Sequence, residues 1–409
     1  MNRRTFLATL SAAPLLADEI RSKAEGLKIT SVGLVKARQK RPRPEYTPRA
    51  GSYWTQRIAA RPMSIYPKYN GPKALWEPDG GGIPVFTVEI GTNQGITGLG
   101  QGGPGGGYIV EQHLKKLLMG ENPLDIEMLW DIMWRSTLYY GRKGAVIHAI
   151  SGVDLALWDL MGKFTGLPVW RLLGGRTRER VPAYATGNDI DQSAEFGFKK
   201  VKLALPYGPA EGKEGIRKNV DLIKRTRATL GPDGHIMLDC WMALTEEYTL
   251  QLAEAVAPYD VYWIEEALPP DDYEGYGRLN AAVRKPLIVT GEHHYTRYDF
   301  RQLVHHNAAR IWQPDIQWCG GLSELRRIGA LASSYDIPVI PHGGGLNGAI
   351  HYIVNATNSP WAELALPAPG GPEVVYKLFE EEKKITRGPE GVYMAPPSEP
   401  GMGWQFEAG

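Results

Sequence analysis

The chain is poor in cysteine, in unbalanced charge and in long apolar runs. Its two cysteines, Cys240 and Cys319, are too few for a disulfide framework or a CxxC metal site, so we expect free thiols. The 46 basic and 45 acidic side chains leave a formal net charge of +1, which gives no electrostatic basis for binding nucleic acid. No stretch reaches the roughly 18 apolar residues of a membrane-spanning helix. We therefore expect neither a nucleic acid nor a membrane as partner.

The sequence also lacks a convincing dinucleotide fingerprint. Gly98–Gly103 matches GxGxxG, but more glycines and Pro104 follow it instead of a helix. No clear acidic residue ends a second strand about 20 residues further on, where the ribose partner belongs. A nicotinamide-dependent oxidoreductase is therefore disfavoured.

The N-terminus resembles an export signal. Arg3 and Arg4 precede Thr5-Phe6-Leu7 and an apolar stretch to Ala17, the pattern of a twin-arginine signal over residues 1–17. Such a signal predicts a periplasmic or otherwise exported protein. The alternative is a chance arginine pair at the end of a cytoplasmic protein.

With 409 residues, 43% of them apolar, the chain is long enough for one barrel and a smaller domain. Strand-like runs at Leu27–Val35 and Val85–Ile90 and helical periodicity to Phe164 predict a first domain over residues 27–160. The Pro-, Gly- and aromatic-rich segment 41–82 is typical of a lid, whose Tyr53 and Trp54 would contact a substrate or, alternatively, pack on their own domain. Residues 367–409 are expected to fold back on this domain.

The second domain, residues 161–366, shows a repeating unit. Five acidic or imidazole side chains each follow a short apolar run, at steps of 26, 27, 23 and 27 residues. They are Asp239, Glu265, Glu292, Asp315 and His342. Helical patterns such as Thr245–Ala257 and Gly321–Ser334 lie between the runs, which predicts βα units with parallel strands. In a closed (β/α) barrel the carboxyl ends of the strands converge on one mouth, where chemistry takes place.

Asp239, Glu265 and Glu292 supply three hard oxygen ligands from adjacent strands. Such a set suits Mg²⁺, which keeps its other coordination positions for water and substrate. The alternative is that each carboxylate pairs with a nearby lysine or arginine. For three in register at strand ends we favour one Mg²⁺ per subunit.

Asp315 and His342 end neighbouring strands, so the carboxylate can accept the imidazole N–H and leave the other nitrogen as a general base. On the predicted second strand, period-two alternation sends Lys200, Lys202 and Ala204 toward the barrel interior. Lys202 would neutralise a ligand carboxylate or touch substrate, whereas Lys200 would be a solvated charge at the other end. A metal with a carboxylate-held base predicts proton abstraction next to a carboxylate.

These residues resemble the enolase superfamily. The matching motifs lie throughout the mature chain: Asp154–Leu160, Gly162-Lys163, Leu172–Gly175, Leu238–Trp241, Trp263–Glu266, Thr290–His294 and Gln313–Asp315. The resemblance is to the mandelate-racemase-like subgroup and, within it, to the L-rhamnonate dehydratases, through Tyr184–Gly187, Tyr207–Pro209, Leu268–Pro270, Trp318–Leu322, Pro341–Gly343 and Pro62–Ser64.

The resemblance implies an α/β fold, a modified TIM barrel (β/α)7β with an N-terminal α+β capping domain. It places the metal on Asp239, Glu265 and Glu292. It gives catalytic roles to His342, Asp315, Glu363 and Lys202, and a homo-oligomer as the assembly. Side chains expected at the substrate are Tyr53, Trp54, Lys202, Trp241, His293 and His294.

The sequence thus predicts an Mg²⁺-dependent acid-sugar dehydratase that forms a metal-stabilised enediolate and eliminates water across C2–C3. Ala204 replaces the second lysine of racemases, which argues against racemisation. Tyr53 stands where a lid histidine is expected, so the particular sugar acid stays open. The alternatives are an epimerase or cycloisomerase using His293, His294 or Lys202 as donor, and an exported sugar-acid-binding protein without turnover.

Overall fold

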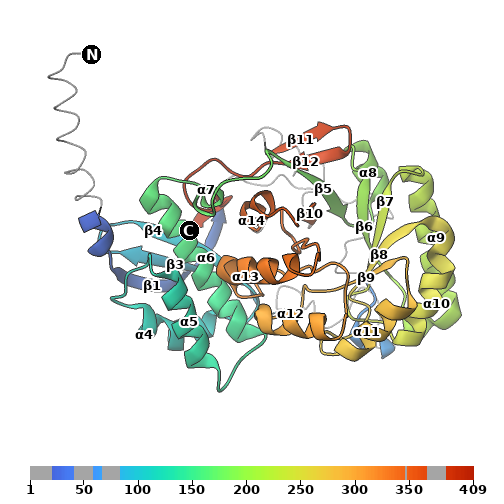
Figure 1. The fold of residues 1–409 in the computed structure, drawn as a ribbon, viewed down its shortest axis with the longest axis horizontal. Helices are drawn as coiled ribbons and strands as arrows, with labels where there is room; N and C mark the ends of the chain where they lie inside the picture. The colour runs from blue at the N-terminus through green and yellow to red at the C-terminus, as the bar shows by residue number, and fades with distance from the viewer. Residues whose placement is uncertain (1–20, 41–58, 67–82, 346–347, 366–383) are drawn as a thin grey trace, which may run out of the picture.

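The computed structural model describes residues 21–40, 59–66, 83–345, 348–365 and 384–409, and the structural statements below refer to these. In Figure 1 a sheet with its helices lies on one side and a barrel-like ring of strands and helices on the other. The predicted signal segment, residues 1–17, and the lid residues Tyr53 and Trp54 lie outside the described residues.

The first part is an antiparallel sheet packed on helices. Its strands, in the order β1-β3-β4, are β1 (Ile29–Val35), β3 (Phe86–Thr92) and β4 (Thr97–Gly102). Its helical segments are α3 (Gly107–Ile109), η3 (Val110–Leu114), α4 (Lys115–Leu118), α5 (Ile126–Thr137), α6 (Ala145–Thr165) and α7 (Val169–Leu172). The short helix η1 (Pro62–Ile65) instead lies against the second part, where the Ala60 N–H donates to the Leu205 carbonyl oxygen. The apolar runs that predicted two strands form β1 and β3, so these predictions are confirmed.

The glycines of the GxGxxG match serve helix packing. Gly98, Gly100 and Gly102 alternate along β4, and period two turns all three toward α6. A Cβ at Gly98 would lie 2.1 Å from the carbonyl oxygen of Ala156, and one at Gly100 would lie 2.0 Å from that of Gly152. The glycines therefore let the strand and helix backbones touch.

The second part is a (β/α)7β barrel-like domain. Its parallel strands are β5 (Val181–Thr186), β6 (Lys200–Ala204), β7 (His235–Asp239), β8 (Val261–Glu265), β9 (Leu287–Val289) and β10 (Ala362–Ala365). Its outer helices are α8 (Ile190–Glu195), α9 (Gly212–Leu230), α10 (Glu246–Val256), α11 (Tyr273–Ala282), α12 (Thr296–His305), α13 (Gly321–Ser333) and α14 (Ile350–Asn355). Short 3-10 turns, η4 (Pro209–Glu211) and η5 (Ala257–Tyr259), flank α9 and α10.

Two predicted strands are reduced to single parallel bridges. Thr290 pairs with Trp312, and Trp312 pairs with Val339, which continues the ring after β9. Pro314, Pro338 and Pro341 lie in or beside these runs, and proline has no N–H to donate to a ladder. The strands are therefore short, but they still carry Asp315 and His342 to the same end as the others.

The C-terminal tail touches both parts. Its hairpin, β11 (Ile385–Gly388) and β12 (Gly391–Met394), pairs with β5 of the barrel sheet. Its last strand, β13 (Phe406–Ala408), pairs with β2 (Ala37–Gln39) near the first domain. Figure 1 shows the hairpin beside β5 and the C-terminus beside β4 and α6.

Helix α6 is the long core helix between the two parts. By length and composition it could cross a membrane, so the expectation that no stretch is apolar enough was wrong at this helix. Its apolar window is 89% buried inside the protein, packed on β4 and α13. It is mostly apolar on all its faces because nearly all of its residues are buried.

Candidate active site

The candidate site lies on top of an apolar layer inside the barrel. That layer is formed by Tyr184, Met237, Trp263, Val289, Ile311 and Ile340. Successive inward-facing positions on a strand are two residues apart. Two residues beyond members of this layer lie Thr186, Asp239, Glu265, Gln313 and His342. The alternation that fills the barrel therefore also places these polar side chains at its mouth.

Asp239, Glu265 and Glu292 come together as predicted from the sequence, with one carboxylate oxygen of each within 4.8 Å of the others. Burial and the neighbouring carboxylates raise the pKa of Glu265 to about 8 and that of Glu292 to about 7. Burial also raises the pKa of Asp239. Buried carboxylates that repel one another are a fitting set for a hard dication, since all donors are oxygen.

A second group, Glu266, Glu292 and His293, is equally close. However, this group offers an imidazole in place of a third carboxylate, and His293 Nδ1 already donates to Glu266 Oε2 at 2.7 Å, whereas Mg²⁺ prefers oxygen ligands. The all-carboxylate set is therefore the better metal site.

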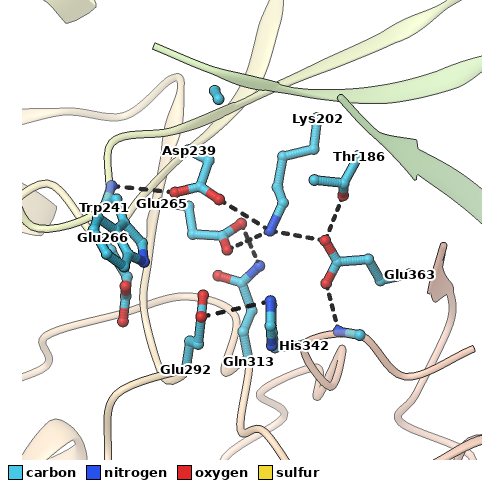
Figure 2. Close-up of polar contacts among 12 residues, drawn as sticks. Thr186, Lys202, Asp239, Trp241, Glu265, Glu266, Glu292, Gln313, His342 and Glu363 are labelled. Atoms are coloured by element: carbon cyan, nitrogen blue, oxygen red, sulfur yellow. Dashed lines mark hydrogen bonds and ion pairs between the residues drawn. The ribbon is translucent and has the colours of Figure 1, made fainter. Parts of the chain in front are cut away.

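Lys202 lies at the centre of the acidic side chains (Figure 2). Its ammonium is 2.6 Å from Glu265 Oε1, 2.9 Å from Glu363 Oε1 and 3.4 Å from Asp239 Oδ2. Burial lowers the pKa of this amine, but the carboxylates outweigh burial and raise it well above its usual value. Lys202 thus carries a fixed positive charge.

Lys200, two residues earlier, is buried at 5% exposure and donates to the carbonyl oxygen of Glu390. The prediction of a solvated charge was wrong. The hairpin β11–β12 covers this end of the barrel.

Glu363, at the second residue of β10, connects Lys202 to the His342 loop. It accepts hydrogen bonds from Thr186 Oγ1 and, at 2.7 Å, from the backbone N–H of Gly343. Burial alone would raise the pKa of the Glu363 carboxyl, but Lys202, His342 and the Thr186 hydrogen bond lower it to about 2. The ionised carboxylate therefore holds the residue next to His342.

His342 and Asp315 form a hydrogen-bonded pair. Nδ1 of His342 lies 2.7 Å from Asp315 Oδ2, and Nε2 lies 3.5 Å from Glu292 Oε1 (Figure 2 shows the second contact). Burial lowers the pKa of the imidazole, but Glu292, Glu363 and Asp315 outweigh it and raise the pKa well above its usual value. Nε2 therefore faces the carboxylates while Nδ1 is anchored.

Of the other residues predicted to contact the substrate, Trp241 and His293 lie beside the carboxylates of the site, whereas His294 does not. Trp241 donates its backbone N–H to Asp239 Oδ1, and its ring centroid lies 6.1 Å from that of His293. Burial lowers the pKa of His293, but Glu266 and Glu292 raise it to about 9. His294, expected beside His293, instead packs between Tyr273 and Phe300 of the outer helices, and burial lowers its pKa to about 4.

The residues that orient Glu265 were not predicted from the sequence. Gln313 Nε2 donates to Glu265 Oε2 at 2.6 Å, and Trp263 Nε1 donates to the same oxygen at 3.0 Å. Gln313 stands two residues before Asp315, so the period of two was the available signal. The role of Glu266 as partner of His293 was missed as well, although it adjoins Glu265. Both cysteines are free and buried, as predicted free.

The racemase lysine position, Ala204, has no titratable group. Its backbone N–H and carbonyl both pair with the Asn188 side chain, at 2.9 Å each. A proton donor on that face must come from another position.

A two-domain architecture with acidic side chains at the barrel mouth defines an enolase-type protein. Residues 187–408 match the family model described as enolase C-terminal domain-like. Residues 82–174 match that described as the mandelate racemase / muconate lactonizing enzyme N-terminal domain. The chain belongs to the mandelate racemase/muconate lactonizing enzyme family of the enolase superfamily.

Within that family the chain is similar to L-rhamnonate dehydratases. It is 42% identical to the L-rhamnonate dehydratase of Saccharopolyspora erythraea over 365 residues, 88% of this chain and 92% of that one. The crystal structure of L-rhamnonate dehydratase from Gibberella zeae superposes with a TM-score of 0.80 at 34% identity, covering 93% of this chain and 94% of that one. That protein has also been crystallised in complex with Mg.

A cycloisomerase is also similar in structure. The 3,6-anhydro-D-galactonate cycloisomerase from Zobellia galactanivorans gives a TM-score of 0.70 at 26% identity, covering 93% of this chain and 97% of that one. The fold and the family thus accommodate both elimination and isomerisation.

Proposed function

We propose that the protein is an Mg²⁺-dependent acid-sugar dehydratase that acts on L-rhamnonate or a close relative. The observation that carries the proposal is the Asp315–His342 pair, in which Nδ1 is bonded to Asp315 and Nε2 lies 3.5 Å from Glu292 Oε1 of the Asp239, Glu265 and Glu292 set. The similarity to two L-rhamnonate dehydratases supports the substrate class.

Asp239, Glu265 and Glu292 would hold the metal. Bound there, Mg²⁺ supplies positive charge against the charge that develops on the substrate carboxylate, and it offsets the carboxylates that raise the pKa of His342. Lys202 and Gln313 donate hydrogen bonds to the two oxygens of Glu265 and orient its carboxylate.

In this proposal Nε2 of His342 removes the proton from C2 of the acid sugar, and Asp315 holds the opposite nitrogen in its N–H form. The electron pair left at C2 moves toward the carboxylate. It returns to form the C2–C3 double bond as the C3 hydroxyl leaves. That hydroxyl takes the proton from Nε2 and departs as water. The enol then ketonises to a 2-keto-3-deoxy acid, so His342 ends as it began.

His293 supports a second candidate function, that of an epimerase or cycloisomerase. Its Nδ1 is held by Glu266 at 2.7 Å, the same arrangement that Asp315 gives His342. A second anchored imidazole could return a proton to the substrate. Dehydration remains the favoured proposal because the more similar relatives are dehydratases.

The test is incubation of the purified protein with Mg²⁺ and a set of aldonic and uronic acids, L-rhamnonate included, in D₂O. Semicarbazide absorbance reports 2-keto acid and NMR reports exchange at C2, with His342→Asn as the control. Keto acid that is lost in the variant supports the dehydratase. Exchange at C2 or an epimer without keto acid would indicate an isomerase. If no acid gives keto acid or exchange, the result would favour a binding protein without turnover.

We also propose that the protein is a homo-oligomer exported through its N-terminal arginine pair. Light scattering on the purified protein tests the first point. For the second, Arg3→Lys together with Arg4→Lys should abolish export of a fused periplasmic reporter. A reporter still exported by the double variant would contradict the proposal.

A further inference from the structure

The segment that carries Asp315 is held by the first domain. After Asp315 the chain turns back on itself, because Trp318 and Cys319 donate their backbone N–H groups to the Asp315 carbonyl at 3.0 and 2.7 Å. Residues 317–323 then run against β4, α5 and α6, which all belong to the first domain. Contacts between the first domain and this segment therefore affect the position of Asp315.

Gln317 connects the first domain to the Asp315 carboxylate. Its backbone N–H donates to Asp315 Oδ1 at 2.6 Å, on the carboxylate whose other oxygen holds His342. Its side-chain amide donates to Gln101 Oε1 on β4 at 3.0 Å, and its carbonyl accepts from the Gly103 N–H at 3.3 Å. Two hydrogen bonds from the first domain therefore hold Gln317, one at its side chain and one at its carbonyl oxygen, and the N–H of the same residue orients the Asp315 carboxylate.

Gly103 also forms the seat of Trp318. A Cβ at Gly103 would lie 2.6 Å from Trp318 Cδ1 and 2.8 Å from His148 Cγ, so only glycine fits without displacing the indole. The Trp318 ring lies 4.9 Å from that of His293 and 6.0 Å from that of His342, measured between centroids. A displaced indole would therefore press on both imidazoles at the mouth.

Further along, the same segment is anchored more firmly. Ser151 accepts the Gly320 N–H at 2.9 Å, and Trp130 donates to the Gly320 carbonyl at 2.8 Å. Asp154 accepts from the Ser323 N–H and hydroxyl at 3.0 and 2.5 Å. These buried contacts hold the segment as a whole, whereas Gln101 and Gly103 act within two residues of Asp315.

We propose that Gln101 and Gly103 are positioning residues, through which the first domain sets the orientation of the Asp315–His342 pair. They do so by hydrogen bonding to Gln317 and by leaving room for the Trp318 indole. The glycine run that matches a nucleotide motif thus has a second role beyond helix packing. This inference rests on the proposed function only in taking His342 as the base. The contacts themselves do not depend on which acid is the substrate.

The test compares Gly103→Ala with Gly33→Ala, the same change in β1 of the same sheet, where a Cβ meets nothing within 4 Å. With Mg²⁺ and L-rhamnonate, Gly103→Ala should lower kcat at least about tenfold while KM changes less than about threefold, because a misplaced base weakens the chemical step more than binding. Gly33→Ala should match the wild type. Equal kcat values in the two variants would overturn the inference.

Should Gly103→Ala not fold, Gln101 provides the second test. Gln101→Leu removes the acceptor for the Gln317 amide and should lower kcat. Gln101→Glu keeps an acceptor, so its kcat should stay close to that of the wild type. A leucine variant as active as the glutamate variant would contradict a role for the Gln101–Gln317 hydrogen bond in positioning Asp315.

A readout without turnover separates this inference from the proposed function. In protein labelled with ¹⁵N-histidine and supplied with Mg²⁺, the Nδ1–H proton bonded to Asp315 should give a low-field signal that His342→Asn removes. The signal should persist in Gly33→Ala and be lost or shifted in Gly103→Ala and Gln101→Leu. If the wild type does not turn over L-rhamnonate, the proposed substrate is wrong. This signal still tests whether Gln101 and Gly103 position the Asp315–His342 pair.

Discussion

Lys202 shows how one buried charge holds the site together before any metal binds. Its ammonium contacts Glu265, Glu363 and Asp239, and it is fully buried. Removing one partner of a buried ion pair leaves the others as uncompensated charges in a poorly solvating environment. This lysine therefore contributes to stability as well as to chemistry.

We expect Lys202→Met to lower the free energy of unfolding by about 3 to 5 kcal/mol in metal-free buffer. Lys200→Met is the matched control, because the Lys200 ammonium donates to the neutral carbonyl of Glu390 instead of to carboxylates. Urea unfolding of both variants measures the difference. Equal losses would mean that the carboxylates do not depend on Lys202.

His351 is a buried neutral imidazole that fastens three segments. Its Nδ1 accepts the Trp170 N–H at 3.0 Å, and its Nε2 lies 3.1 Å from the carbonyl oxygen of Met402. Burial lowers its pKa to about 4. The unfolded chain, with a pKa of about 6.5, binds the proton first as pH falls.

Stability should therefore be lost as pH falls from about 6.5 to about 4, by about 3 kcal/mol at most from His351. His351→Gln can keep both hydrogen bonds but does not titrate, so its unfolding free energy should depend less steeply on pH in this window. Urea titrations at half-unit steps of pH measure both slopes. Parallel slopes would show that His351 is not the source.

At the scale of elements, the contact between β4 and α6 has no room for a side chain. We expect Gly100→Ala to destabilise the protein by at least about 1 to 3 kcal/mol, because its Cβ would meet the Gly152 carbonyl oxygen at 2.0 Å and the Ala156 nitrogen at 2.5 Å. Backbone atoms cannot move aside as side chains can. Gly33→Ala serves again as the control, and thermal unfolding is the measurement. Similar melting temperatures would contradict the close packing.

Regular elements were predicted well where their pattern was local. The segment Thr245–Ala257 became α10, Gly321–Ser334 became α13 and the predicted second strand with Lys200 and Lys202 became β6. The runs ending at Asp315 and His342 were also found, but their reduction to single bridges depends on prolines and on pairing partners distant in sequence. Periodicity shows which face is buried, not how many ladder bonds form.

At the scale of the whole molecule, the metal site exists only when the barrel is closed. Because burial and the neighbouring carboxylates raise the pKa of Glu265 to about 8 and that of Glu292 to about 7, part of the site is protonated at pH 7. Metal binding must displace these protons.

We therefore expect Mg²⁺ to bind with proton release near pH 7 and with an affinity that rises from pH 6 to pH 8. Calorimetry in buffers of different ionisation enthalpy counts the protons, and Glu265→Gln should abolish both the binding and the rise in melting temperature that Mg²⁺ produces. Binding without proton release would contradict the raised pKa values.

The sequence by itself determined the two-domain (β/α)7β class and brought Asp239, Glu265, Glu292, Asp315 and His342 to one mouth. It did so because each residue ends a strand, and parallel strands share one carboxyl end. Only the tertiary structure decided the partners of these side chains. Gln313 on Glu265, Glu363 on the loop after His342 and Gln101 on the Asp315 segment join residues 20 to 216 positions apart. Such contacts depend on barrel closure and domain docking, which no local pattern records.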